Sequence, residues 1–346
     1  MALTLPWDRW PDVDQQTWTT LFTNGGPLDD RGALAHVRPT TRTSLERAYS
    51  RWLKWVQDRA PEVLAQPPSM RVQAVRLQDW LADLAHTSPM TRRTFVDAVL
   101  RIARAIDEDR DWTPELALQR GLRARASRDH GSRKRGRILS SEVLFDAGRR
   151  LVEEEAPKVA VPLFRATALR DGVMIGLLAL MPMRRRAFTG LRIGASFLPH
   201  AEGFSIALPG TLTKSGLPWE AEVPDPAADL LRIYLRDARP MLAARASDKD
   251  DHLWIGRTGH KFGEDHLRTL ISNGVERITG IPVSPHLFRD AAATTLARHS
   301  PDAATLVQPL LAHTCGGVAE RHYIHATSID AGRNYAKVLR RLRGDA

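Results

Sequence analysis

The stretch Pro285-His286-Leu287-Phe288-Arg289 opens a segment whose apolar residues recur at helical spacing. Leu311-Ala312-His313 follows further along the chain, and His322-Tyr323 comes after that. Arginine and imidazole side chains hold phosphate oxygens through bidentate or charge-assisted hydrogen bonds. A tyrosine beside them can act as a nucleophile on phosphorus. This order of residues predicts a helical domain that carries a site for phosphate chemistry.

Upstream of this stretch, the sequence predicts a long apolar helix over residues 161–180, which Pro182 ends or kinks. Alternating apolar residues predict two strands, at 204–208 and 219–223, with Thr213-Lys214-Ser215-Gly216 in the turn between them. Helical spacing dominates the remainder, over residues 140–152, 226–242, 264–278, 285–298, 303–311, 317–323 and 329–342. We therefore expect a mostly α domain at 139–346, with a small antiparallel sheet, a lysine at the sheet's tip and a C-terminal tail helix.

Residues 1–122 predict a separate helical bundle. Thr43 and Glu46 have the spacing of a capping box at the start of one helix, and a second helix is expected over 71–86. Ser88-Pro89 and Thr113-Pro114 each place a capping residue before a proline, which marks the start of two more helices. Seven of the nine tryptophans lie at or before Trp112, so we expect them to anchor this bundle's core.

Residues 123–138 are basic, contain glycine and serine, and have no apolar face. They predict a linker between the two domains. Such a linker either stays in solvent or also lies on a DNA backbone, and both readings remain open. The candidates for DNA contact within it are Arg133, Lys134, Arg135 and Arg137.

The composition limits the class of protein. The chain has 346 residues, of which 43% are hydrophobic and 26% charged, as in a globular protein of about two domains. It has no apolar run near the ~20 residues of a membrane span, and we see no secretory signal. Cys315 is the single cysteine, which excludes an intramolecular disulfide and a Cys-rich zinc site and favours the cytoplasm.

The net charge is +10 and the pI about 10.3, values that favour a polyanionic partner such as nucleic acid. A genome rich in arginine codons is the other explanation of this excess. Arginine greatly outnumbers lysine, and its planar fork is the better match for phosphate oxygens.

Six residues in a fixed order resemble the tyrosine recombinases, the phage integrase family. They occur in Met183-Arg184, Thr213-Lys214-Ser215-Gly216, His286-Leu-Phe-Arg289, Leu311-Ala312-His313 and Arg321-His322-Tyr323. The resemblance covers residues 140–326. It implies a catalytic domain of that family at 139–346, and the bundle at 1–122 resembles the family's core-binding (SAM-like) DNA-binding domain in layout.

Two arginines compete for the first position of this pattern. Thr189-Gly190-Leu191-Arg192 matches the Thr-Gly-Leu-Arg motif that is usual in the family. Arg192, however, follows an arginine run instead of an apolar helix. Arg184 has the expected context, and we choose it. Arg185 and Arg186 are then candidates for DNA phosphates. The chain departs from the family at Ala187, where an acidic residue is common, at Ala312, and in the longer interval from His313 to Tyr323.

The resemblance implies transesterification without a metal or cofactor. Tyr323 would attack a scissile phosphate and form a 3′-phosphotyrosine, while Arg184, Arg289 and His313 hold the non-bridging oxygens. Lys214 would protonate the leaving 5′-oxygen, and His286 would assist proton transfer or position the phosphate. The implied partner is double-stranded DNA bound by a homotetramer on two sites, with accessory bending or directionality factors, in the cytoplasm at the nucleoid. The alternatives are a type IB topoisomerase and a DNA-binding protein that has lost catalysis.

Overall fold

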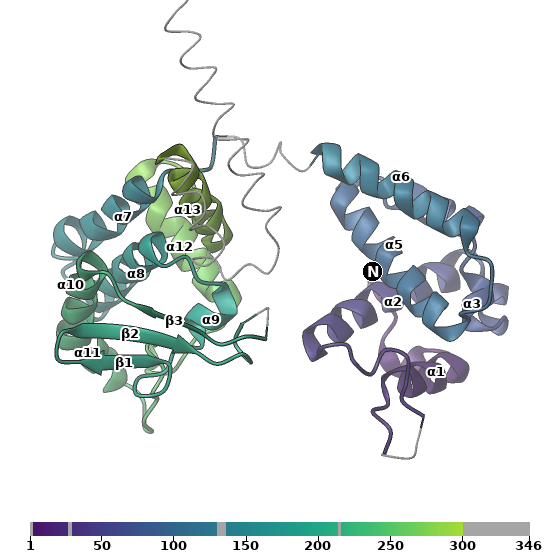
Figure 1. Cartoon of the computed structure of the whole chain (residues 1–346), viewed down its shortest axis with the longest axis horizontal. Helices are drawn as coiled ribbons and strands as arrows, with labels where there is room; N and C mark the ends of the chain where they lie inside the picture. The colour runs from purple at the N-terminus through teal and green to yellow at the C-terminus, as the bar shows by residue number, and fades with distance from the viewer. Residues whose placement is uncertain (1–2, 27–29, 130–135, 214–215, 300–346) are drawn as a thin grey trace, which may run out of the picture. The chain divides into compact units, whose positions relative to one another are not determined.

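The structure, a computed structural model, describes residues 3–26, 30–129, 136–213 and 216–299. Its contacts divide the chain into two units, Met1–Arg133 and Lys134–Ala346, each of which is described by itself (Figure 1). The helices expected at 303–311, 317–323 and 329–342 lie outside the described residues. Within the described ranges, no helix combines the length and the apolar character needed to cross a bilayer.

The N-terminal unit is all helical in its described part, as predicted. Its α-helices are α1 Asp12–Phe22, α2 Pro39–Arg59, α3 Pro68–Arg71, α4 Ala74–Asp83, α5 Pro89–Ile106 and α6 Thr113–Asp129, with short 3₁₀ helices at Trp7–Arg9 and Pro61–Ala65. α6 continues through residues 123–129, which the sequence placed at the start of the linker. Ala126 is buried and Arg123 pairs with Asp97 at 3.5 Å, so these contacts hold the added turns on the bundle.

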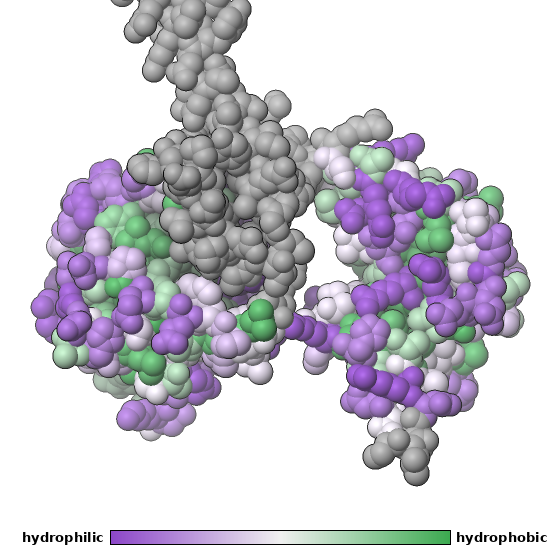
Figure 2. All heavy atoms as spheres, in the orientation of Figure 1, coloured by the Kyte–Doolittle hydropathy of each residue, from purple (hydrophilic) through white to green (hydrophobic). Residues whose placement is uncertain are grey.

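Tryptophans fill the core of this unit, as the sequence predicted. Five of them are buried: Trp10, Trp18, Trp52, Trp80 and Trp112. The rings of Trp52 and Trp80 meet edge to face at 5.2 Å, an arrangement that adds specific geometry to the burial of large apolar surfaces. The visible surface of this unit is largely hydrophilic, with scattered apolar residues (Figure 2).

The predictions of where helices start in this unit were right at Ser88 and wrong at Thr43. The Ser88 cap is confirmed, because its side-chain oxygen accepts a hydrogen bond from the Thr91 amide at 3.1 Å. The capping box at Thr43 is wrong: α2 begins a turn earlier at Pro39, and the Thr43 hydroxyl donates to the Pro39 carbonyl. The helix expected over 71–86 is shorter in the structure: Arg71 ends α3 and turns into the core, and α4 follows after a break, from Ala74 to Asp83.

A buried ion pair explains that break. Arg71 is fully buried and donates from Nη1 to Asp14 at 2.6 Å, while its other nitrogens donate to the carbonyls of Gln66 and Leu64. Tyr49 donates its hydroxyl to the same Asp14 carboxylate at 2.6 Å. Because a buried charge is tolerated only when it is paired and hydrogen-bonded, the chain leaves helical geometry here to deliver these partners.

The C-terminal unit is mostly helical and contains one small sheet, in agreement with the predicted fold class. Its helices are α7 Ser141–Arg150, which continues as a π-helical turn at Leu151–Glu155, α8 Pro162–Leu180, α9 Arg185–Thr189, α10 Asp225–Ile233, a π-helical turn at Tyr234–Ala238, α11 Arg239–Ala243, α12 Glu264–Thr279 and α13 Pro285–His299. The apolar α8 is buried along much of its length and ends two residues before Pro182, as the sequence predicted.

α7 and α8 approach closely at three glycines. A Cβ atom on Gly148 of α7 would lie 2.5 Å from the Gly176 nitrogen and 2.7 Å from the Gly172 oxygen of α8. Real Cβ atoms do not approach backbone atoms this closely, so only glycine lets the two backbones meet here. This contact fixes α8, and with it the segment that leads to Arg184.

The sheet has three antiparallel strands in the order β1-β2-β3: Phe197–His200, Gly203–Leu208 and Trp219–Glu222. β2 and β3 are the two predicted strands, with Ser205 opposite Glu222 and Leu208 opposite Trp219. β1 was not predicted, because Pro199 interrupts its alternation and its pairing is set by β2. The hairpin between β2 and β3 carries Lys214 outside the described residues.

Candidate active site

Arg184 sits at the point where two helices meet. The chain leaves α8 through Met181, Pro182 and Met183, all of them buried, and Arg184 then takes the N-cap position of α9 with an extended backbone. Its side chain is half-buried, and this desolvation lowers the pKa of its guanidinium below the ordinary value. The apolar run before Arg184 therefore places a charged group at the edge of the core.

His286 and Arg289 lie in the first turns of α13, three residues apart and so on neighbouring positions of one helix face. His286 is exposed, whereas Arg289 is only 6% exposed. The Nη1 atom of Arg289 donates to the carbonyl oxygen of Pro182 at 2.6 Å. This hydrogen bond joins α13 to the segment that precedes Arg184, across more than a hundred residues of sequence.

The guanidinium of Arg289 lies in an unfavourable electrostatic setting. Burial, followed by the positive charge of nearby Arg184, lowers the pKa of Arg289 to about 10, while Asp290 acts in the opposite direction. The structure thus brings Arg184 close to Arg289, and His286 lies three residues before Arg289 on the same helix, so that three of the six predicted site residues are placed. Like charges held near one another in a desolvated place form a site suited to an anion.

Arg192, the competitor for the first position, lies elsewhere. It donates from Nη1 to the Asp251 carboxylate at 2.6 Å, and both side chains are about half exposed. Its backbone amide donates to the Ser196 hydroxyl, and its carbonyl accepts from the amides of Ser196 and Phe197, in the turn that leads into β1. Arg192 therefore serves a local ion pair, whereas Arg184 is the arginine whose charge reaches Arg289.

Ala187, the departure from the family pattern, is 3% exposed and packs in the apolar core beside Phe188. An acidic side chain at that position would be buried among apolar groups. The buried carboxylate beside Arg289 is instead Asp290, which is 5% exposed. The sequence interpretation missed Asp290; its signal was an acidic residue directly after the arginine of the His-x-x-Arg motif.

The neck of the hairpin that carries Lys214 is described on both of its sides. The Thr213 hydroxyl donates to the Leu217 carbonyl at 2.7 Å and lies 3.1 Å from that of Gly210. A Cβ on Gly210 would lie 2.1 Å from the Gly216 oxygen, so the two sides of the neck nearly touch. Lys214 itself, His313 and Tyr323 lie outside the described residues, and their placement stays a prediction.

The residues predicted to contact DNA differ in their surroundings. Arg186 is exposed, but Arg185 pairs with Asp265 at 3.4 Å and with Glu264 at 3.9 Å, at the start of α12. Arg137 donates from Nη2 to the Pro282 carbonyl at 2.8 Å. The remaining candidates, Arg133, Lys134 and Arg135, lie outside the described residues.

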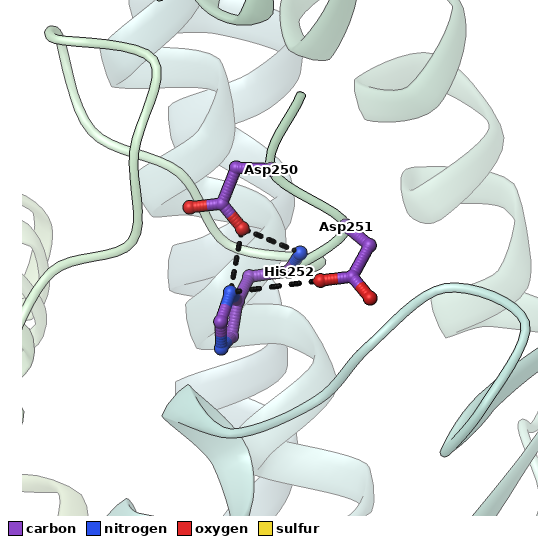
Figure 3. Close-up of side chains that lie close together, drawn as sticks. All are labelled: Asp250, Asp251 and His252. Carbon is purple, nitrogen blue, oxygen red and sulfur yellow. Dashed lines mark hydrogen bonds and ion pairs between the residues drawn. The ribbon is translucent and has the colours of Figure 1, made fainter. Parts of the chain in front are cut away.

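One cluster has the composition of a metal site. Ligand atoms of Asp250, Asp251 and His252 lie within 4.8 Å of one another (Figure 3). The Asp250 carboxylate, however, already accepts from the His252 ring, from the His252 amide and from the Lys261 amide. Desolvation would raise the pKa of Asp250, but these hydrogen bonds prevail and lower it to about 2. Asp251 is paired with Arg192. The hydrogen bonds and ion pairs of this cluster therefore stabilise the local loop around residues 250–252.

Comparison with known proteins adds sequence and fold relationships to this geometry. No protein-family model matches the chain. The tyrosine recombinase XerC of Mycobacterium leprae is 27% identical over 239 residues, which cover 69% of this chain and 74% of that protein. The tyrosine recombinase XerD of Ralstonia nicotianae is 34% identical over 160 residues, which cover 46% of this chain and 48% of that protein.

A solved structure shares the fold. The crystal structure of the XerH site-specific recombinase bound to a palindromic difH substrate superposes with a TM-score of 0.59 at 15% identity, covering 83% of this chain and 76% of that one. The structural match extends over most of this chain and supports the predicted fold class of a mostly helical protein with a small sheet. In sequence this chain is similar to the tyrosine recombinases XerC and XerD, and its fold is similar to that of the XerH recombinase.

Proposed function

We propose that this chain is a site-specific DNA recombinase that cuts and rejoins DNA through a 3′-phosphotyrosine at Tyr323. The observation that carries the proposal is the pairing of Arg184 with Arg289. Two guanidinium groups from distant parts of the sequence lie close enough for one charge to lower the pKa of the other. A phosphate between them would relieve that repulsion, and its charge increases as the transition state forms.

Each of the six residues has a role in this proposal. Arg184, Arg289 and His313 bind the non-bridging oxygens, and Lys214 gives its proton to the 5′-oxygen that leaves when Tyr323 attacks. The imidazole of His286, which lies on an exposed residue, assists proton transfer or positions the phosphate. The new phosphotyrosine ester replaces the broken phosphodiester, so a later attack by a 5′-hydroxyl reseals the DNA without an external energy source.

The substrate is double-stranded DNA. The net charge of +10 favours a polyanion, and solved recombinases of this fold are bound to DNA substrates. We further propose that four copies assemble on two DNA sites, because exchange between two duplexes requires four strand cleavages. Accessory factors that bend DNA or set the direction of exchange fit the same scheme.

The test is a trap for the covalent intermediate. A pool of nicked duplexes with random sequence is incubated with the protein, and a short fragment at the nick diffuses away after cleavage. We expect a protein–DNA adduct that survives denaturation, and sequencing of the trapped DNA then gives the preferred site. Tyr323→Phe should form no adduct and should still bind that site. The matched control is Tyr335→Phe, which retains Tyr323 and should form the adduct normally.

Other outcomes point to other functions. Binding without any adduct from the wild-type protein would identify a DNA-binding protein that has lost catalysis. An adduct accompanied by relaxation of supercoiled DNA, with no recombinant product from paired sites, would identify a topoisomerase activity. An adduct that persists in Tyr323→Phe would place the nucleophile at another residue.

A further inference from the structure

The chain leads into its C-terminal unit beside the helix that carries His286 and Arg289. We call residues 137–141 the lead-in segment. At one end Arg137 donates from Nη2 to the carbonyl of Pro282, which comes three residues before α13, at 2.8 Å. At the other end the Ser141 amide donates to the hydroxyl of Thr295, in the later part of α13, at 3.1 Å. The segment is therefore attached at both ends to one element.

The two attachments require the lead-in segment to run along α13. Four residues of extended chain cover about 13 Å, to which the Arg137 side chain adds its own reach, while the attachments at Pro282 and Thr295 are separated by three residues of loop and about 15 Å of helix. The attachments follow the same order in both stretches, so segment and helix run in the same direction. α7 starts where the segment ends and packs against α13 (Figure 1).

Packing supports the two hydrogen bonds. Ile138 and Leu139, in the middle of the lead-in segment, are half-buried and pack against the core of the C-terminal unit. Ser140 then caps α7, since its hydroxyl accepts from the Val143 amide at 3.4 Å. The segment is thus anchored by two apolar side chains and a helix cap as well as by its ends.

Arg137 has a different role here from the one that its basic neighbourhood indicated. Its guanidinium binds a carbonyl of the protein, in the turn that sets the start of α13. That start determines where His286 and Arg289 lie, because both belong to the first five residues of the helix. A shift of the lead-in segment would therefore move the groups proposed to hold the phosphate.

We propose that Arg137 and Thr295 are positioning residues for DNA cleavage, which hold the lead-in segment along α13 and thereby fix the placement of His286 and Arg289. The inference rests on the proposed function of that site. It also means that a displacement of the chain at residue 137 would displace the start of α13.

The first experiment separates positioning from DNA binding. Single-turnover cleavage of the nicked duplex selected above is measured at saturating protein for Arg137→Ala and Thr295→Val, together with the salt dependence of binding. We expect cleavage to fall by about 10-fold or more, since small displacements of reacting groups are costly, with binding and its salt slope unchanged. Arg137→Lys restores one donor for the Pro282 carbonyl and should recover most of the rate.

The control is Arg186→Ala, at an exposed arginine predicted to contact a phosphate. Loss of one phosphate contact should weaken binding and reduce the salt slope by about 1. If Arg137→Ala shows that behaviour, with normal cleavage at saturation, then Arg137 is a DNA contact and the inference fails. It also fails if Arg137→Ala and Thr295→Val both cleave at the wild-type rate.

A second measurement does not depend on catalysis. Amide hydrogen exchange in peptides spanning residues 283–295 should be faster in Arg137→Ala and Thr295→Val than in the wild type, and unchanged in Arg186→Ala. Unchanged exchange in all three variants would contradict the attachment. If the wild-type protein forms no adduct, the proposed function fails, while this exchange result still decides whether the lead-in segment holds α13.

Discussion

Arg289 donates a hydrogen bond from Nη1 to the carbonyl oxygen of Pro182 at 2.6 Å, and only 6% of the residue is exposed. The bond satisfies a backbone oxygen just beyond the end of α8, where helix carbonyls lose their partners. It also positions the guanidinium next to Arg184, two residues after Pro182. One side chain therefore does two things: it ties α13 to the end of α8, and it supplies a cation to the site.

Arg289→Lys tests this double role. An ammonium group is a single compact charge and does not offer the planar fork of a guanidinium, so it does not replace both the Pro182 bond and a bidentate phosphate contact. We expect cleavage of a nicked duplex to fall by about 100-fold or more in a protein that keeps its helical circular dichroism. Wild-type cleavage by this variant would remove Arg289 from the site.

The matched control is Arg192→Lys, which changes the arginine paired with Asp251 on the surface. An exposed ion pair contributes roughly 0–1 kcal/mol to stability, so cleavage and folding should both stay close to wild type. A large loss of cleavage in Arg192→Lys would reverse the choice of Arg184 over Arg192. The pair of variants thus tests the assignment as well as the mechanism.

Asp290→Asn should make cleavage more sensitive to alkaline pH. The Asp290 carboxylate raises the pKa of Arg289, whereas burial and Arg184 lower it to about 10. Loss of the carboxylate lowers this pKa further, so Arg289 gives up its proton at a lower pH. We expect the alkaline limb of the cleavage profile to move to lower pH, as measured by single-turnover cleavage between pH 7 and 10.5.

The same change should reduce stability at neutral pH. Because the pKa of Arg289 is lower in the folded protein than in the unfolded chain, its buried charge opposes folding at every pH below the folded pKa. Asp290→Asn removes the opposing charge and should lower the free energy of unfolding by roughly 1–3 kcal/mol. Asp229→Asn, in an exposed pair with Arg232, is the control and should change little. An unshifted profile in Asp290→Asn would contradict the coupling.

The sequence was a good guide wherever a local pattern decided the structure. The apolar run of α8 and its stop at Pro182, the Ser88 cap and the alternation of β2 and β3 are all short-range signals, and each prediction is confirmed. The selection of Arg184 also used only its neighbours. The fold class and the resemblance to the tyrosine recombinases followed from these patterns.

Features set by distant partners were not predictable in this way. Arg71 turns into the core because its partner there is Asp14, which lies 57 positions away in the sequence. The contacts of Arg185 with two acids at the start of α12 also could not be predicted from its neighbours in the sequence. The charge balance around Arg289 likewise depends on its burial and on the approach of Arg184, which the sequence does not show, although Asp290 directly follows Arg289 in the chain.

Gly148→Ala should strongly destabilise the C-terminal unit. The new methyl group would lie 2.5 Å from the Gly176 nitrogen and 2.7 Å from the Gly172 oxygen, and these are backbone atoms that cannot turn aside. α7 and α8 must then separate, at a cost of roughly 1–3 kcal/mol or more in the free energy of unfolding. Amide hydrogen exchange in peptides of α7 and α8, followed as the urea concentration rises, measures the change in this unit.

A glycine with open surroundings gives the control for this prediction. Gly263 precedes α12 and has an ordinary backbone angle, and a methyl group added to it would have no other atom within 4 Å among the described residues. Gly263→Ala should change the free energy of unfolding by less than about 1 kcal/mol. Equal effects of the two substitutions would show that the close contact of α7 with α8 contributes nothing specific.

Asp14→Asn should destabilise the N-terminal unit while leaving the chemistry of the C-terminal unit intact. The carboxylate of Asp14 is the charge partner of the fully buried Arg71 and also accepts the hydroxyl of Tyr49. An amide keeps the shape but leaves the Arg71 charge uncompensated in the core, at a cost of roughly 3–5 kcal/mol. Denaturation followed by tryptophan fluorescence reports this loss, since most tryptophans lie in this unit.

Asp12→Asn is the matched control, because Asp12 is exposed on the same helix. Its loss removes only a favourable charge near the helix start, worth about 0.3–1 kcal/mol.

Tyr49 adds a dependence on pH. Burial, and then the charge of Asp14, raises the pKa of Tyr49 well above 10, so the folded state keeps a proton that the unfolded chain loses above pH 10. Stability must therefore fall as the pH rises beyond 10, and Tyr49→Phe should flatten that fall. A fall of the same steepness in Tyr49→Phe would show that other groups cause it.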